Sequence, residues 1–122
     1  MSDLSISIRE DRGVTIVDPA GKIALGESSQ QLHSELKGLI EEGNKNILIN
    51  LSNVKMIDSS GLGTLVAGYT TVERAGGQLK LTNLSDKASE LMTITKLYTV
   101  FDVFDDENAA INSFSNASEA AV

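Results

Sequence analysis

With 122 residues, 41% of them hydrophobic, the chain is long enough for one domain that buries roughly two thirds of its unfolded surface around a single core. Seventeen acidic residues against ten basic residues give a formal net charge of −7, which disfavours direct binding to DNA or RNA. The chain has no cysteine, so disulfides and thiolate metal sites are excluded.

The first elements predict an antiparallel hairpin. Residues 4–8 alternate between apolar and polar side chains, as in a strand with one side in solvent. A turn at residues 11–13 leads into a second strand that begins at Val14. Pro19 lacks a backbone N–H and Gly21 weakens a strand, so these two residues are expected to end the second strand or to place it at a sheet edge.

A helix is predicted next. Ser28 and Gln31 have the spacing of a capping box, in which two side chains satisfy backbone N–H groups at a helix start. Apolar residues then recur three or four positions apart between residues 32 and 40, and Gly43 ends the pattern. This helix is expected to lie against the sheet.

Helices and strands alternate through the rest of the chain. Residues 47–51 form a nearly continuous apolar run, which is typical of a strand covered on both faces. An apolar stripe at helical spacing follows between residues 62 and 72, until two glycines end it. The remaining predicted elements are a strand at residues 78–82, a helix over residues 86–96, a strand near residues 100–104, and a last helix that begins with Asp105 or Asp106.

This order predicts an α/β fold. The expected architecture is a mixed β-sheet, entered through the N-terminal antiparallel hairpin and continued by parallel strands, with about four helices packed mainly on one face. Residues 1–114 are expected to form this single domain. Residues 115–122 are small and polar without periodicity, and are expected to form a frayed tail.

The most informative stretch for function is Met-Ile-Asp-Ser-Ser-Gly-Leu-Gly, which ends at Gly63, where a buried strand passes into a helix. A helix start offers unpaired N–H groups and a partial positive charge, so Ser59 or Ser60 can cap the helix and a phosphate is favoured there. Gly61 and Gly63 would let another protein's backbone or a nucleotide approach closely. Local chemistry alone favours the simpler interpretation that Asp58 and the two serines are only a helix cap.

The motif is also part of a wider similarity. Asp-Ser-Ser-Gly-Leu-Gly at residues 58–63, preceded by the strand region 47–54, resembles the signature of the STAS domain family, specifically the bacterial anti-sigma factor antagonists. The similarity extends to residues 76–81, 91–97 and 101–104, so it covers nearly the whole chain.

The resemblance implies a partner-switching cycle. In that family the first serine after the aspartate, here Ser59, is phosphorylated by a partner that is both an anti-sigma factor and an ATP-dependent serine kinase with a histidine-kinase-like fold. The unmodified antagonist binds this kinase and frees a sigma factor. Phosphorylation prevents this binding, and a metal-dependent serine phosphatase removes the phosphate again. The chain would then be a substrate and not an enzyme, with no cofactor or metal of its own.

The other residues of the motif are assigned to a partner-binding switch loop. Asp58 is expected to shape the turn and to supply negative charge, and Ser60 to support the turn or cap the helix. Gly61 and Gly63 are expected to permit close approach, and Leu62 to be either a partner contact or part of the core.

One position departs from the family pattern. Many such antagonists have an acidic residue after a Gly-x-hydrophobic turn, where this chain reads Gly-Lys-Ile and then Ala24. If an acidic residue there contributes to recognition, Ala24 leaves the identity of the kinase partner open.

Two other roles stay open for a domain of this family. One is a scaffold in a stressosome-like assembly, with a static contact at the serine region, and the other is a soluble accessory subunit of an ABC transporter. No apolar run approaches the roughly 20 residues that a membrane-spanning helix needs. Residues 1–5 lack the pattern of a secretory signal, so we expect a cytoplasmic protein that does not enter the membrane.

Other candidate sites are not supported by their spacing. His33 is expected to be at least partly in solvent, and nothing in the spacing places it beside Ser59 or Ser60 as a catalytic triad would require. The Gly-x-Ser-x-Gly pattern of hydrolases is also absent. The glycines at 61 and 63 are not followed by the Lys-Ser or Lys-Thr of a nucleotide-binding loop. The acidic residues near the last helix lack calcium-loop spacing and are explained by the helix dipole: Asp102, Asp105, Asp106 and Glu107.

Overall fold

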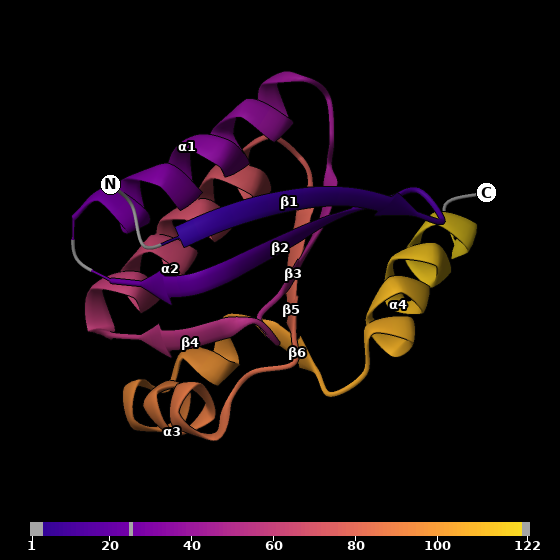
Figure 1. Cartoon of the computed structure of the whole chain (residues 1–122). Coiled ribbons are helices and arrows are strands. Elements are labelled where there is room, and N and C mark those ends of the chain that lie inside the picture. Colours follow the sequence, from indigo (N-terminus) through magenta and orange to yellow (C-terminus); the bar gives the residue numbers. More distant parts are fainter. Residues whose placement is uncertain (1–3, 25, 121–122) are drawn as a thin grey trace.

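The fold is built on one mixed sheet with helices on both faces (Figure 1), so the predicted α/β class is confirmed. The structure is a computed structural model that describes the backbone of residues 4–24 and 26–120 and the side chains of these residues through Phe114. Within the described residues the elements are, in chain order, β1 (Leu4–Asp11), β2 (Val14–Ile23), α1 (Glu27–Glu41), β3 (Asn46–Asn50), β4 (Val54–Ile57), α2 (Ser59–Arg74), β5 (Gln78–Thr82), α3 (Asp86–Thr95), the 3₁₀ helix η1 (Leu97–Thr99), β6 (Asp102–Phe104) and α4 (Glu107–Ala120).

β1 and β2 form the predicted antiparallel hairpin. The two strands pair from Leu4 opposite Gly21 to Asp11 opposite Val14. The turn residues between them, at positions 12 and 13, have φ angles of 51° and 80°. Positive φ at both positions is the combination of a type I′ turn, whose twist matches that of the paired strands.

β2 continues through Pro19, so the prediction that Pro19 and Gly21 end this strand or place it at an edge is wrong. β2 has β1 on one side, and on its other side it pairs with β3 up to Val17 and with β4 from Gly21 onward. Opposite residues of an antiparallel pair alternate between hydrogen-bonded and non-hydrogen-bonded pairs, and counting from the turn makes Ile6 and Pro19 a non-hydrogen-bonded pair. The nitrogen of Pro19 therefore points away from β1, toward the side of β2 on which β3 and β4 lie. Pro19 is tolerated there because neither β3 nor β4 pairs with β2 at that position.

The remaining pairings of the sheet are parallel, which confirms the predicted mixed sheet. The strand order is β1-β2-β3-β5-β6, and β4 pairs with β2 beyond the end of β3. β5 has the predicted bounds, Gln78–Thr82. The strand predicted near residues 100–104 is shorter, because Leu97–Thr99 form η1 and β6 begins only at Asp102.

β4 is the strand that the sequence pattern did not predict. It has four residues, and its central residues Lys55 and Met56 are exposed. A strand this short with an exposed centre has almost no periodic signal. β4 nevertheless has a specific role in the fold, because it connects the sheet to the start of α2.

α1, α2 and α3 contribute to the larger core on one face of the sheet. Leu36 of α1 lies so close to Gly68 of α2 that a β-carbon on Gly68 would be 2.5 Å from Leu36 Cδ1. Three of the four helices in the described residues therefore share one core, as predicted. Buried members of this core include Val17, Leu32, Leu36, Ile47, Ile49, Leu62, Leu65, Val72, Leu81, Ala88 and Met92.

α1 begins differently from the prediction. Its N-cap is Gly26, which makes no side-chain cap, and its first residue is Glu27. Ser28 therefore lies inside the helix, where its hydroxyl bonds to the backbone N and O of Ala24, both at 3.1 Å. Gln31 does not complete a capping box either, because its side-chain amide donates to Leu4 O and joins α1 to β1.

α4 covers the opposite face of the sheet (Figure 1) over a smaller core. Asp106 Oδ2 accepts from Ala109 N, so Asp106 begins this helix as predicted. The helical backbone continues to Ala120, into the segment where the sequence predicts a frayed tail, and residues 121–122 lie outside the described residues. The smaller core consists of Val14, Ile16, Leu48, Ala110, Ile111 and Phe114.

An ionic and polar network fixes the start of α4 to the sheet. Arg9 of β1 contacts both Asp18 of β2 and Glu107 of α4. Glu107 Oε1 also accepts from Asn50 Nδ2 at 2.9 Å. The hydrogen bond from Arg9 lowers the pKa of the Glu107 carboxyl below its ordinary value, although burial opposes this effect. The carboxylate is therefore the form that this network stabilises.

Candidate switch site at the start of helix α2

The passage from β4 into α2 is capped by Asp58. Its backbone is extended, with φ −102° and ψ −176°, and its Oδ1 accepts from Gly61 N at 2.8 Å. An acceptor at this position satisfies one of the unpaired N–H groups of the first helical turn. The expectation that Ser59 or Ser60 caps the helix is therefore corrected, because both serines lie inside the first turn.

Ser59 and Ser60 differ in accessibility. Ser59 is exposed and is the first residue of the 16-residue helix α2, where the helix dipole favours negative charge. Ser60 is half-buried, and its carbonyl accepts from Thr64 Oγ1 at 3.2 Å. A modifying enzyme can reach the Ser59 hydroxyl more easily than that of Ser60.

The two glycines of the motif have different roles. A β-carbon on Gly61 would lie 2.2 Å from Ile23 O and 2.8 Å from Ile57 Cγ1, so Gly61 is required by a contact inside the domain. The prediction that Gly61 leaves room for a partner is wrong for this reason. Gly63 is exposed, and a β-carbon there would meet nothing within 4 Å. Of the two, Gly63 is the one that leaves the surface open.

Leu62 belongs to the core. Only 2% of its surface is exposed, and it packs in the larger hydrophobic cluster. Of the two roles that the sequence left open for Leu62, the core role is the one that its burial supports. A partner that approaches the start of α2 would therefore meet Ser59 and Gly63, with Asp58 and Ser60 partly accessible beside them.

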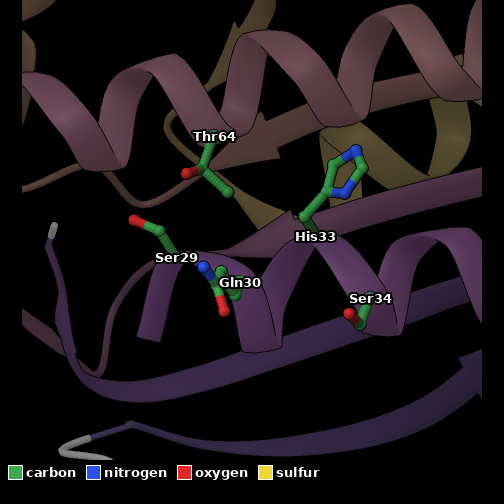
Figure 2. Close-up of a pocket in the computed structure, with 5 residues that line it drawn as sticks. All are labelled: Ser29, Gln30, His33, Ser34 and Thr64. Carbon is green, nitrogen blue, oxygen red and sulfur yellow. The ribbon is translucent and has the colours of Figure 1, made fainter. Parts of the chain in front are cut away.

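A groove between α1 and α2 lies near this site (Figure 2). Its volume is about 380 Å³. Ser29 and His33 project from α1 toward α2, and Thr64 projects from α2 toward α1. Gln30 and Ser34 complete the lining. His33 is half-exposed, as expected, but the groove was not predicted, because hydrophobic periodicity does not indicate how closely two helices approach.

The acidic residues near α4 have structural partners. Asp106 caps α4, Glu107 contacts Arg9, and Asp102 lies 4.0 Å from Lys80 Nζ. Among the residues that the structure describes, no group of three or more His, Cys, Asp or Glu side chains could hold a metal ion. No helix in this part of the chain is both long enough and apolar enough to cross a bilayer.

Comparison with known families identifies the domain. The model of the STAS domain matches residues 5–110. The chain belongs to the STAS domain family. This STAS domain is similar to the anti-sigma-B factor antagonist of Bacillus subtilis, with 33% identity over 101 residues that cover 83% of this chain and 91% of the relative. The predicted family is therefore confirmed.

Solved structures share the fold of this STAS domain. A putative anti-sigma factor antagonist from Thermotoga maritima superposes with a TM-score of 0.82 at 21% identity, covering 88% of this chain and 92% of the other. The anti-sigma factor antagonist SpoIIAA of Bacillus has been solved in unphosphorylated and phosphorylated forms. Both superpose with a TM-score of 0.68, at 20% and 19% identity, and they cover 91% and 90% of this chain and 98% and 99% of SpoIIAA.

The loop between β2 and α1 adjoins the switch site in this STAS domain. Asp58 N donates to Ile23 O at 3.4 Å, which joins the end of β2, directly before this loop, to the start of α2. The next residue, Ala24, is held by Ser28 and also accepts from the hydroxyl of Ser29. Ala24 therefore brings no charge to the switch site from this loop.

Proposed function

We propose that this chain is an anti-sigma factor antagonist that binds an anti-sigma factor while Ser59 is unmodified and releases it when Ser59 is phosphorylated. The observation that carries the proposal is the position of Ser59, exposed on the first turn of α2 directly after the capping residue Asp58. The similarity to a curated anti-sigma-B factor antagonist over most of both chains supports the role.

The partners follow from this role. We propose that the anti-sigma factor is also an ATP-dependent serine kinase with a histidine-kinase-like fold, and that a metal-dependent serine phosphatase restores Ser59. The existence of phosphorylated and unphosphorylated SpoIIAA structures with this fold supports such a cycle. The chain would be the substrate of both enzymes, a regulatory protein in the cytoplasm formed by the domain of residues 1–114. It would influence transcription through protein partners and not through DNA.

One phosphate is sufficient for the switch. It adds about −1.5 to −2 charges beside Asp58. Within the domain the helix dipole favours the anion by roughly 0.3–1 kcal/mol, and repulsion from the carboxylate opposes it by a comparable amount, so the fold changes little. At an interface an unpaired dianion costs several kcal/mol. Since each 1.4 kcal/mol is about tenfold in affinity, the modification can weaken binding by about a hundredfold or more.

The test is a quantitative pull-down from the lysate of the source organism, with retained proteins identified by mass spectrometry. The wild-type chain is expected to retain a histidine-kinase-like ATPase, and Ser59→Asp is expected to lose it. Thr70→Asp is the matched control, because Thr70 is exposed on the same helix three turns later. If wild type and Ser59→Asp retain the same large assembly or the same transporter ATPase, a scaffold or accessory-subunit role replaces the proposed one.

A further inference from the structure

β1 is the one long free edge of the sheet among the residues that the structure describes (Figure 1). The strand order places β1 and β6 at its two ends, and β4 has a partner strand on only one side. β6 has three residues, and β4 has four, with an irregular register opposite Gly21 and Lys22. Short or irregular edges resist pairing with another chain, whereas β1 has eight residues in a regular register.

The outer edge of β1 presents the backbone groups of alternate residues. Counted from the turn, the even-numbered residues of β1 form non-hydrogen-bonded pairs with β2, so their N–H and C=O groups point outward. Leu4 O accepts from Gln31 Nε2 of α1, as expected for an outward carbonyl. Ile6, Ile8 and Glu10 therefore offer three donor and acceptor pairs on a side that no described strand occupies.

The charges along this edge balance one another. Residues 9–12 are Arg-Glu-Asp-Arg and sum to zero, although the net charge of the whole chain is −7. Arg9 is also held within its own domain by Asp18 and Glu107. A basic or an acidic partner strand gains no net attraction along this edge, while a second copy of the chain meets no net repulsion there.

The backbone of a second copy fits this edge in the antiparallel direction. When Ile8 lies opposite Ile8 of the copy, Ile6 lies opposite Glu10 of the copy, and the twofold axis repeats this pair on the other side. All of these are outward-facing residues, so they form hydrogen-bonded pairs. This single register therefore uses all three donor and acceptor pairs of both copies and leaves the occupied carbonyl of Leu4 outside the contact.

The side chains are compatible with the same register. Ser7 lies opposite Arg9 of the copy and Ser5 lies opposite Asp11, so no like charges face each other directly. Ile8 is 41% exposed in the single chain, and the axis brings two copies of this side chain together. Pairing therefore covers an apolar side chain that the single chain leaves in water.

We propose that the chain forms a twofold dimer in which β1 pairs antiparallel with β1 of a second copy and the two sheets become one. An axis perpendicular to the sheet keeps α1 of both copies on one face and α4 of both on the other, so both helix layers continue across the contact. One pair of strands makes a smaller contact than the ordinary 800 Å² or so per partner, so the dimer is expected to be reversible. Its formation requires neither an anti-sigma partner nor phosphorylation of Ser59.

Sedimentation equilibrium of the purified chain tests the dimer. The wild-type chain is expected to associate reversibly at concentrations below about 1 mM. Ile8→Lys is expected to raise the dissociation constant by about tenfold or more, because two ammonium groups would face each other on the axis. Val103→Lys is the matched control, because Val103 is 39% exposed on β6 at the other end of the sheet and the change in net charge is identical. It is expected to dimerise like wild type.

A single introduced cysteine reports the register, because the chain has no cysteine of its own. Cα atoms of a hydrogen-bonded antiparallel pair are about 5.5 Å apart, which a disulfide can span. Ile8→Cys is therefore expected to form a covalent dimer with oxidised glutathione, seen in non-reducing electrophoresis. Val103→Cys is expected to remain a single chain under the same conditions.

Amide hydrogen exchange of the wild-type chain gives a readout that needs no substitution. The N–H groups of Ile6, Ile8 and Glu10 should become protected as the protein concentration rises, while that of Ser7, which is paired with β2, should be protected at every concentration.

Two results would overturn the dimer. One is a wild-type chain that stays monomeric up to about 1 mM, and the other is equal weakening by Ile8→Lys and Val103→Lys. A monomeric chain whose binding to the anti-sigma partner is lost in Ile8→Lys would assign this edge to a partner strand instead, and would leave the role proposed for Ser59 in place.

Discussion

Gly61 packs directly on the carbonyl of Ile23, with room for no β-carbon between them. The contact joins the end of β2 to the first turn of α2, and Asp58 N donates to the same carbonyl. The position of Ser59 is therefore set by the sheet through two neighbouring contacts, not by the loop alone. A change in this packing is expected to affect both stability and the presentation of Ser59.

Gly61→Ala is the direct test of this packing. Alanine is favoured over glycine in a helix by about 1 kcal/mol, but the new methyl group would overlap a backbone oxygen, at a cost of about 1–3 kcal/mol. We expect a net loss of stability in urea denaturation. Gly63→Ala is the control, because nothing lies within 4 Å of its β-carbon. It is expected to be neutral or more stable, and equal effects of the two substitutions would contradict the packing argument.

Asp58→Ala is expected to destabilise the domain by about 1 kcal/mol, because it removes the acceptor of Gly61 N. Asp58→Asn keeps an acceptor and removes the charge, so it should retain most of the stability. Ser85→Ala is a matched control, because Ser85 caps α3 through Ala88 N. We expect a similar loss of stability in Ser85→Ala with unchanged partner affinity. A weaker affinity for Asp58→Asn at normal stability would assign the carboxylate charge a role in recognition.

The long elements with clear periodicity could be predicted from the sequence. The apolar stripe of α2, the apolar run of β3 and the bounds of β5 follow from the spacing of their side chains. The stretch that we propose as the switch motif could also be singled out, because its residues are consecutive in the chain. Its detailed roles could not be predicted, since the burial of Gly61 and Leu62 depends on β2, which is distant in sequence.

The features that the sequence did not predict depend on neighbours in space. Pro19 is tolerated inside β2 because the partner strands on one side leave a gap at that residue. Lys80 lies in an apolar strand and is buried. Its ammonium group lies over the ring of Phe114 and donates a hydrogen bond to the hydroxyl of Ser113. The groove at His33 lies about one turn before the contact of Leu36 with Gly68 between α1 and α2. Local patterns contain none of this information.

The contact between Arg9 and Glu107 predicts that the free energy of unfolding depends on pH. The pKa of Glu107 is lowered in the folded protein, so its stabilising contribution is present at neutral pH and is lost as pH falls through the lowered value. Because the Arg9 side chain is 45% exposed, solvent screening limits the contribution to about 0.2–1 kcal/mol. Glu107→Gln should be less stable than wild type at pH 7, and the difference should shrink as the pH falls below the ordinary glutamate range and through the lowered pKa of Glu107. A constant difference in urea denaturation across that range would contradict this assignment.

Phosphorylation of Ser59 is expected to leave the fold intact. Because the helix dipole and the carboxylate of Asp58 act on the phosphate in opposite directions, the free energy of unfolding should change by less than about 1 kcal/mol. Amide chemical shifts should move in the first turns of α2 and in the adjoining loop after β2, and should remain unchanged in α4 on the opposite face. Widespread shifts would indicate refolding and would contradict a switch confined to the surface.

The residue that accepts the phosphate is identified with the same kinase. Ser59→Ala should no longer be phosphorylated, and Ser60→Ala should still be phosphorylated. The reverse result would move the switch to Ser60.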